Sequence, residues 1–118
     1  MKSSTNKTVF FSWQSDLPKD INYFAIRDSI KKAITGINLS YDEATRGMSG
    51  SINILDTIFN KILAADIFVC DITTVGIIHN KNNNVKKPRP TPNPNVLLEL
   101  GYAIANLGVE RMILIYIL

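Results

Sequence analysis

Short apolar runs and longer amphipathic stretches alternate along the chain. Runs rich in strand-forming residues occupy positions 8–13 and 66–72, and the run at 111–118 is almost wholly apolar. Near-continuous apolar runs are typical of parallel strands that are buried on both faces of a sheet. The run at 37–41 is shorter and more polar, which indicates an edge strand. The pattern therefore predicts one sheet of four strands.

The stretches between these runs show the period of amphipathic helices. Residues 19–35 place Ile26 and Ile30 on one stripe, and Gly36 follows at a usual helix end. Ser51 is a reasonable N-cap for the next helix. The inward-facing positions of that helix are expected to be Ile54, Leu55, Ile58, Ile62 and Ala65. This alternation predicts an α/β fold with a parallel sheet, helices on both faces and right-handed crossovers.

A single carboxylate, Glu99, lies within the third helical pattern, NPNVLLELGYA at 93–103. Asn93 can cap this helix, and Pro94 suits its first position because the missing N–H has no intrahelical partner there. The apolar stripe comprises Val96, Leu100, Ala103 and Leu107, with Glu99 at its margin. The start of such a helix borders the carboxyl ends of the strands, where α/β proteins usually bind ligands. Glu99 is thus either an ionisable group at a ligand site or a glutamate at the rim of the core with its carboxylate in water.

The composition is that of an ordinary globular protein. A length of 118 residues predicts one domain with one core, and 46% of the residues are hydrophobic and 19% charged. The net charge is only +3, and much of the basic excess lies in Lys81, Lys86, Lys87 and Arg89. Because one basic loop is not the wide basic face of a nucleic-acid-binding surface, no nucleic-acid partner is expected.

Membrane and metal sites are also not expected. The sequence has no run of about 20 apolar residues, and the polar residues 1–7, an expected disordered tail, lack the apolar segment of a signal peptide. We therefore expect a soluble, cytoplasmic protein. Cys70, the single cysteine, lies in an apolar run and is expected to be a buried, unreactive thiol. With His79 as the single histidine, a cluster of metal ligands is not expected.

Two segments fit this scheme less well. Residues 73–92 contain NKNNN and KKPRPTP, which suit neither a helix nor a central strand, so a mobile loop beside the ligand crevice is expected. The apolar strand at 111–118 would leave an exposed edge at the end of the chain. The domain at 8–118 is therefore expected to be truncated at its C-terminus.

Four motifs together resemble a TIR domain, in particular the bacterial TIR-like proteins. They are FFSWQSD at 10–16, DEATRGMSGS at 42–51, ADIFVCDIT at 65–73 and NPNVLLELGYA at 93–103. The resemblance covers nearly the whole chain after residue 8. It implies a flavodoxin-like three-layer sandwich with a parallel sheet in the strand order 2-1-3-4, in which the family's fifth strand and final helix are missing.

The resemblance also implies cleavage of NAD+ at the bond between nicotinamide and ribose, with Glu99 as the catalytic residue. A carboxylate suits this chemistry without a cofactor or metal, because it stabilises the positive charge that develops on the ribose as nicotinamide leaves. The matching substrate-binding residues are Phe11, Ser12 and Trp13 at the end of the first strand, and Arg46, Gly47, Ser49 and Gly50 in the loop before the second helix. Packing by Trp13, and a solvated turn in place of a diphosphate-binding loop, remain open alternatives.

Two other interpretations of the same residues stay open. Nucleoside 2-deoxyribosyltransferases are also similar to this sequence, and there Glu99 would attack the sugar while Asp71 contacts the sugar or base. The non-enzymatic interpretation is a TIR module that only binds other TIR domains. The TIR resemblance further implies self-association and a role in bacterial antiphage defence or signalling, with NAD+ either hydrolysed or cyclised.

Overall fold

The computed structural model describes residues 7–46, 52–79 and 88–118, without the side chains of residues 52 and 53. The helices of these ranges are α1 (Tyr23–Ala33), α2 (Ile52–Ala64) and α3 (Pro94–Leu107), and a 3-10 turn, η1 (Val109–Arg111), follows α3. The strands are β1 (Lys7–Ser12), β2 (Leu39–Glu43), β3 (Ile67–Asp71), β4 (Gly76–Ile78), β5 (Arg89–Thr91) and β6 (Met112–Ile115). Lys7 of the expected tail already belongs to β1, and residues 1–6 and Ser51 lie outside the described ranges.

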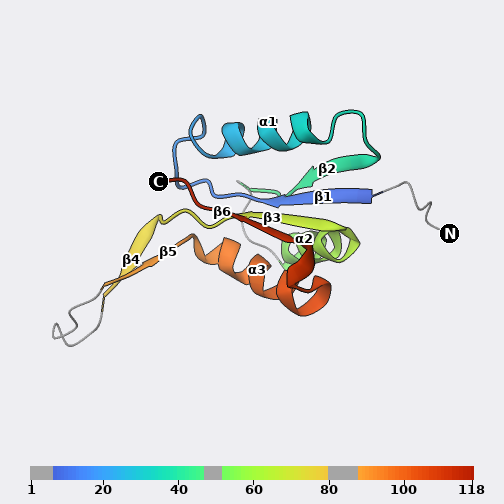
Figure 1. The fold of residues 1–118 in the computed structure, drawn as a ribbon. Helices are drawn as coiled ribbons and strands as arrows, with labels where there is room; N and C mark the ends of the chain where they lie inside the picture. The colour runs from blue at the N-terminus through green and yellow to red at the C-terminus, as the bar shows by residue number, and fades with distance from the viewer. Residues whose placement is uncertain (1–6, 47–51, 80–87) are drawn as a thin grey trace.

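The main sheet is parallel throughout and has the strand order β2-β1-β3-β6. Because β6 is the fourth strand of this sheet, the predicted order 2-1-3-4 is confirmed. α1 covers one face of the sheet, whereas α2 and α3 cover the other (Figure 1). The architecture is therefore the expected flavodoxin-like three-layer sandwich, and the polar run 37–41 contributes to the edge strand β2.

The core lies around the two central strands, β1 and β3, which run side by side. Phe10 in β1 and Phe68 in β3 are fully buried, and their rings stack with centroids 5.9 Å apart. Ile58 and Ile62 of α2 complete the core as predicted. Leu55 was expected to face inward but is 38% exposed. The helical period gives the direction of a side chain, but it does not say whether other elements cover that position.

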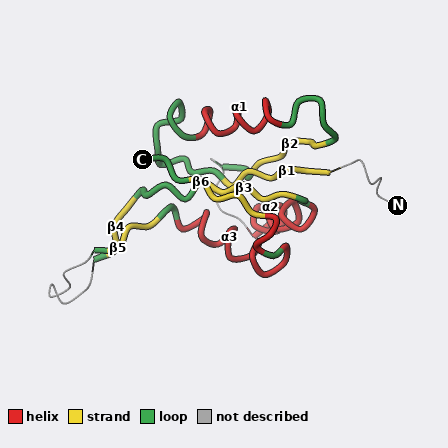
Figure 2. The backbone as a smooth tube through the Cα atoms, viewed as in Figure 1, coloured by secondary structure: helices red, strands yellow, loops and turns green. Residues whose placement is uncertain are grey.

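The segment 73–92 contains a pair of short strands, where a mobile loop was expected. β4 and β5 pair antiparallel, with Ile77 opposite Pro90, and they project away from the main sheet (Figure 2). Proline is tolerated in such a ribbon because each strand is an edge whose outer N–H groups need no partner strand. Residues 80–87 of the predicted mobile loop lie outside the described ranges.

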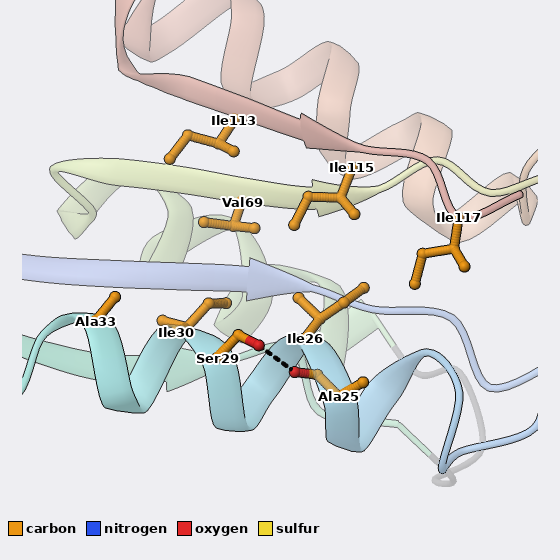
Figure 3. Close-up of a pocket in the computed structure, with 9 residues that line it drawn as sticks. All are labelled: Ala25, Ile26, Ser29, Ile30, Ala33, Val69, Ile113, Ile115 and Ile117. Carbon is orange, nitrogen blue, oxygen red and sulfur yellow. Dashed lines mark hydrogen bonds between the residues drawn. The ribbon is translucent and has the colours of Figure 1, made fainter.

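An apolar groove of about 370 Å³ remains between α1 and β6. It is lined by Ala25, Ile26, Ser29, Ile30, Ala33, Val69, Ile113, Ile115 and Ile117. The isoleucines of β6 and the segment after it point toward α1 (Figure 3). The Ser29 hydroxyl donates to the Ala25 carbonyl at 2.7 Å, and the lining carries no charged side chain, so the groove has no group suited to catalysis.

Among the described residues, every helix is too short or too polar to cross a membrane.

Candidate functional site

The start of α3 is fixed at the carboxyl ends of β1 and β3. The Asn93 side chain caps the helix by accepting a hydrogen bond from the Asn95 N–H at 2.7 Å, and Pro94 is the first helical residue, as predicted. Gln14, which sequence reasoning missed, is buried and bridges this start to the sheet. Its Oε1 accepts from the Asn93 N–H at 2.6 Å, and its Nε2 donates to the Thr73 carbonyl at 2.9 Å.

Glu99 is buried on the inner side of α3, with 1% of its surface exposed. Its stripe neighbours Val96 and Ala103 are also fully buried, whereas Leu97 and Leu98 are 44% and 48% exposed. Of the two alternatives for Glu99, the carboxylate in water at the rim of the core is therefore wrong. A buried carboxylate needs charged or hydrogen-bonding partners, because its desolvation is otherwise very unfavourable.

Two side chains supply those partners. The Ser12 hydroxyl, at the end of β1, donates to Glu99 Oε1 at 2.6 Å. The Arg46 guanidinium forms a bidentate ion pair with the same carboxylate, at 2.6 Å to Oε2 and 2.9 Å to Oε1. Parallel N–H···O bonds of this kind are among the strongest polar contacts in proteins. Both oxygens of Glu99 are therefore already bonded in this structure.

Arg46 is itself held against the end of β1. Its Nε and one terminal nitrogen donate to the Trp13 carbonyl at 3.1 and 2.9 Å, and its guanidinium carbon lies 5.9 Å from the centre of the Trp13 ring. The Arg46 side chain is only 10% exposed. Arg46 thus links a loop residue, a strand end and the helix carboxylate in one buried cluster.

Cys70 lies next to this cluster in β3 and is fully buried. Burial raises the pKa of its thiol to about 12, and the nearby carboxylates of Glu99 and Asp71 act in the same direction. Near neutral pH the sulfur is therefore a protonated thiol, which is a poor nucleophile. The expectation of a buried, unreactive cysteine agrees with this environment.

Asp71 was expected to contact substrate, but the structure places it in a hydrogen-bond network with Thr73 and Asn22. It is fully buried, and its Oδ1 accepts from the Thr73 N–H at 3.0 Å and from the Thr73 hydroxyl at 2.6 Å. Its Oδ2 accepts from the Asn22 amide at 3.1 Å. The Thr73 hydroxyl also accepts from the Ile117 N–H at 3.0 Å. Asp71 therefore joins the end of β3 to the loop before α1 and to the segment after β6.

Phe11 and Trp13 were also expected to contact substrate, but their rings pack in the core. Phe11 is fully buried and stacks on Tyr23, and Trp13 is 7% exposed with its ring 4.3 Å from that of Tyr23. The Trp13 indole N–H donates to the Ala44 carbonyl at 2.7 Å. Side chains alternate along a strand, so Ser12 points to the α3 face while its two aromatic neighbours point to the α1 face.

The loop before α2 is only partly described. Arg46 belongs to the site, whereas Gly47, Ser49 and Gly50 lie outside the described ranges, so their expected contact with substrate stays a prediction. Within the described ranges, no group of three histidine, cysteine, aspartate or glutamate residues could hold a metal ion. The chemistry that these residues can offer is that of one carboxylate with an arginine and a hydroxyl beside it.

Comparison with known proteins relates the chain to a family. The family model described as "CAP12/Pycsar effector protein, TIR domain" matches residues 23–117. Among solved structures, a 2-desoxiribosyltransferase from Leishmania mexicana superposes with a TM-score of 0.62 at 20% sequence identity. The match covers 93% of this chain and 64% of that one, so this chain spans less than two thirds of its length, and the likeness concerns the fold alone. No curated protein matches the sequence.

Proposed function

The chain belongs to the TIR-domain family of CAP12/Pycsar effector proteins, and on that premise we propose that it cleaves NAD+ between nicotinamide and ribose with Glu99 as the catalytic carboxylate. The observation that carries the proposal is the burial of Glu99 at the carboxyl ends of the central strands. Ligands of open α/β sheets bind at that edge. Burying the Glu99–Arg46 ion pair has a desolvation penalty that apolar side chains at the same positions would avoid, so a purely structural role does not explain the pair well.

The reaction matches the charge of the site. As the glycosidic bond breaks, its electron pair leaves with nicotinamide, which becomes neutral, and positive charge develops on the ribose. An oriented anion in a buried site stabilises that charge strongly. Water then adds to the sugar and releases a proton, which gives ADP-ribose. Attack by a group of the substrate itself in place of water would give a cyclic product, and Glu99 has the same role in both cases.

In the cell, this activity fits a bacterial defence effector. Removal of NAD+, or release of a signal derived from ADP-ribose, follows directly from the reaction. We further propose that the domain associates with other TIR domains, as its family suggests.

A nucleoside 2-deoxyribosyltransferase is the second candidate, because the fold of such an enzyme superposes on this chain. That reaction also needs a carboxylate beside a sugar, so Glu99 would serve it. The role considered for Asp71 in that reaction has less support, because both of its oxygens accept hydrogen bonds from Thr73 and Asn22.

One assay separates the candidates. The purified chain is incubated with NAD+ in one sample and with a deoxynucleoside plus a second free base in another, and the products are separated by chromatography. Nicotinamide and ADP-ribose from NAD+, without base exchange, are the expected result. Base exchange without nicotinamide release would favour the second candidate. Concentration-dependent association with neither reaction would favour a TIR interaction module.

A further inference from the structure

Glu99 is not free to meet a substrate in this structure. Its two oxygens accept three hydrogen bonds, one from Ser12 and two from Arg46, and 1% of its surface is exposed. A ribose can approach the carboxylate only if one of these partners leaves. Ser12 has a short side chain on the central strand β1 and cannot move far. Arg46 has a long, flexible side chain outside the helices and strands, so it is the partner that can leave.

Catalysis also requires that departure. The proposed role of Glu99 is to stabilise positive charge on the ribose, but in this structure the guanidinium of Arg46 already neutralises the carboxylate from 2.6 Å. A cation so close to the reacting sugar would oppose the charge that develops there. Arg46 must therefore exchange Glu99 for another anion before the bond breaks.

The substrate carries such an anion. In NAD+, the nicotinamide, its carboxamide and both riboses have no negative charge, and the diphosphate attached to the same ribose is the anionic group. The forked donors of arginine match phosphate as well as carboxylate. We propose that Arg46 recognises the diphosphate of NAD+, and that its transfer from Glu99 to the diphosphate frees the carboxylate for the ribose. This inference rests on the proposed function, since it takes NAD+ as the substrate.

The exchange makes Arg46 a specificity-determining residue. A substrate with a diphosphate releases Glu99 as it binds, whereas nicotinamide riboside, which has no phosphate, leaves the Arg46–Glu99 pair in place. Glu99 and the diphosphate thus compete for one arginine. The two interactions of Arg46 are therefore linked by a coupling free energy. It can be measured as the change in diphosphate affinity when Glu99 is altered.

Binding of ADP measures the competition without any turnover, because ADP contains the diphosphate but no nicotinamide. Calorimetric titrations with ADP compare the wild-type chain with Glu99→Gln, Arg46→Gln and the double variant. Glu99→Gln removes the charge that pairs with Arg46, so the affinity for ADP is expected to rise at least about fivefold. In the Arg46→Gln background the same change is expected to raise it less than about twofold. Glu110→Gln and Arg111→Gln, exposed changes at the opposite end of the sheet, are the matched controls.

Two results would overturn the proposal. Equal tightening by Glu99→Gln in both backgrounds would show that only repulsion between Glu99 and the phosphates was removed. No tightening in either background would show that Arg46 does not leave Glu99 when a diphosphate binds. Both results concern ADP alone, so they are independent of whether the chain cleaves NAD+.

A second measurement covers the case in which Arg46→Gln fails to fold, and it needs only the wild-type chain. The kcat/KM for nicotinamide release is compared between NAD+ and nicotinamide riboside. A preference of at least about tenfold for NAD+ is expected from the release of Glu99 by the diphosphate. Equal values for the two substrates would contradict the exchange even though nicotinamide is released.

Discussion

Replacing Asp71 by alanine should destabilise the domain without involving the Glu99 site. The change removes the acceptor of two buried N–H groups, the Thr73 main chain and the Asn22 amide, which donate to Asp71 at 3.0 and 3.1 Å. Each buried donor left without a partner costs about 1–3 kcal/mol, so the free energy of unfolding should fall by about 2–6 kcal/mol. The buried Thr73 hydroxyl, which donates to Asp71 at 2.6 Å, loses its acceptor as well and adds to this loss.

Urea unfolding measures this loss directly. Trp13 is the single tryptophan and lies in the core, so its fluorescence reports global unfolding. The urea midpoint of Asp71→Ala should fall by more than about 1 M with an unchanged slope. Asp56→Ala, at an exposed position of α2, should stay within about 0.5 kcal/mol of the wild type. If Asp71→Ala unfolds like Asp56→Ala but loses NAD+ cleavage, Asp71 contacts the substrate and the structural role is wrong.

Two further predictions concern the thiol beside the site and the cap of its helix. Burial raises the pKa of Cys70 to about 12 in the folded state, above the value of an unfolded thiol, so this group stabilises the fold fully below about pH 9 and progressively less toward pH 12. Urea titrations at pH 8 and pH 10 should show that loss, and a Cys70→Ala variant should show a smaller one; equal losses would exclude Cys70 as a cause. Asn93→Ala removes the cap of α3 and should lower the free energy of unfolding by about 1 kcal/mol. In the same urea assay, the neighbouring exposed change Asn95→Ala keeps the capped main-chain N–H and should have less effect.

The layers could be predicted from local patterns in the sequence, whereas the strand order was implied by the resemblance to TIR domains. The runs at 8–13 and 66–72 are rich in apolar residues, which is typical of strands in a parallel sheet with helices on both faces. The limits of the elements were less accurate. β2 begins at Leu39 and α1 at Tyr23, both later than the apolar pattern indicated.

The polar contacts of the site could be predicted only in part. Glu99 and Arg46 were identified from the family motifs, but their ion pair joins residues 53 positions apart and has no local signal. The buried Gln14 and Asn22 were missed for the same reason, since their partners lie in distant segments. The error for Phe11 was avoidable, because the alternation of side chains along β1 places it on the face opposite Ser12.

The most direct measurement of the proposed chemistry is nicotinamide release from NAD+ by the wild-type chain, Glu99→Gln and the matched control Glu110→Gln. The glutamine keeps the shape of Glu99 but removes its charge, so the rate should fall at least about a hundredfold if the carboxylate stabilises the ribose cation. Glu110 is exposed in η1, so its variant should keep the wild-type rate. Trp13 fluorescence and urea unfolding confirm that each variant is folded. Near-wild-type release of nicotinamide by folded Glu99→Gln would contradict the assignment of Glu99 as the catalytic carboxylate.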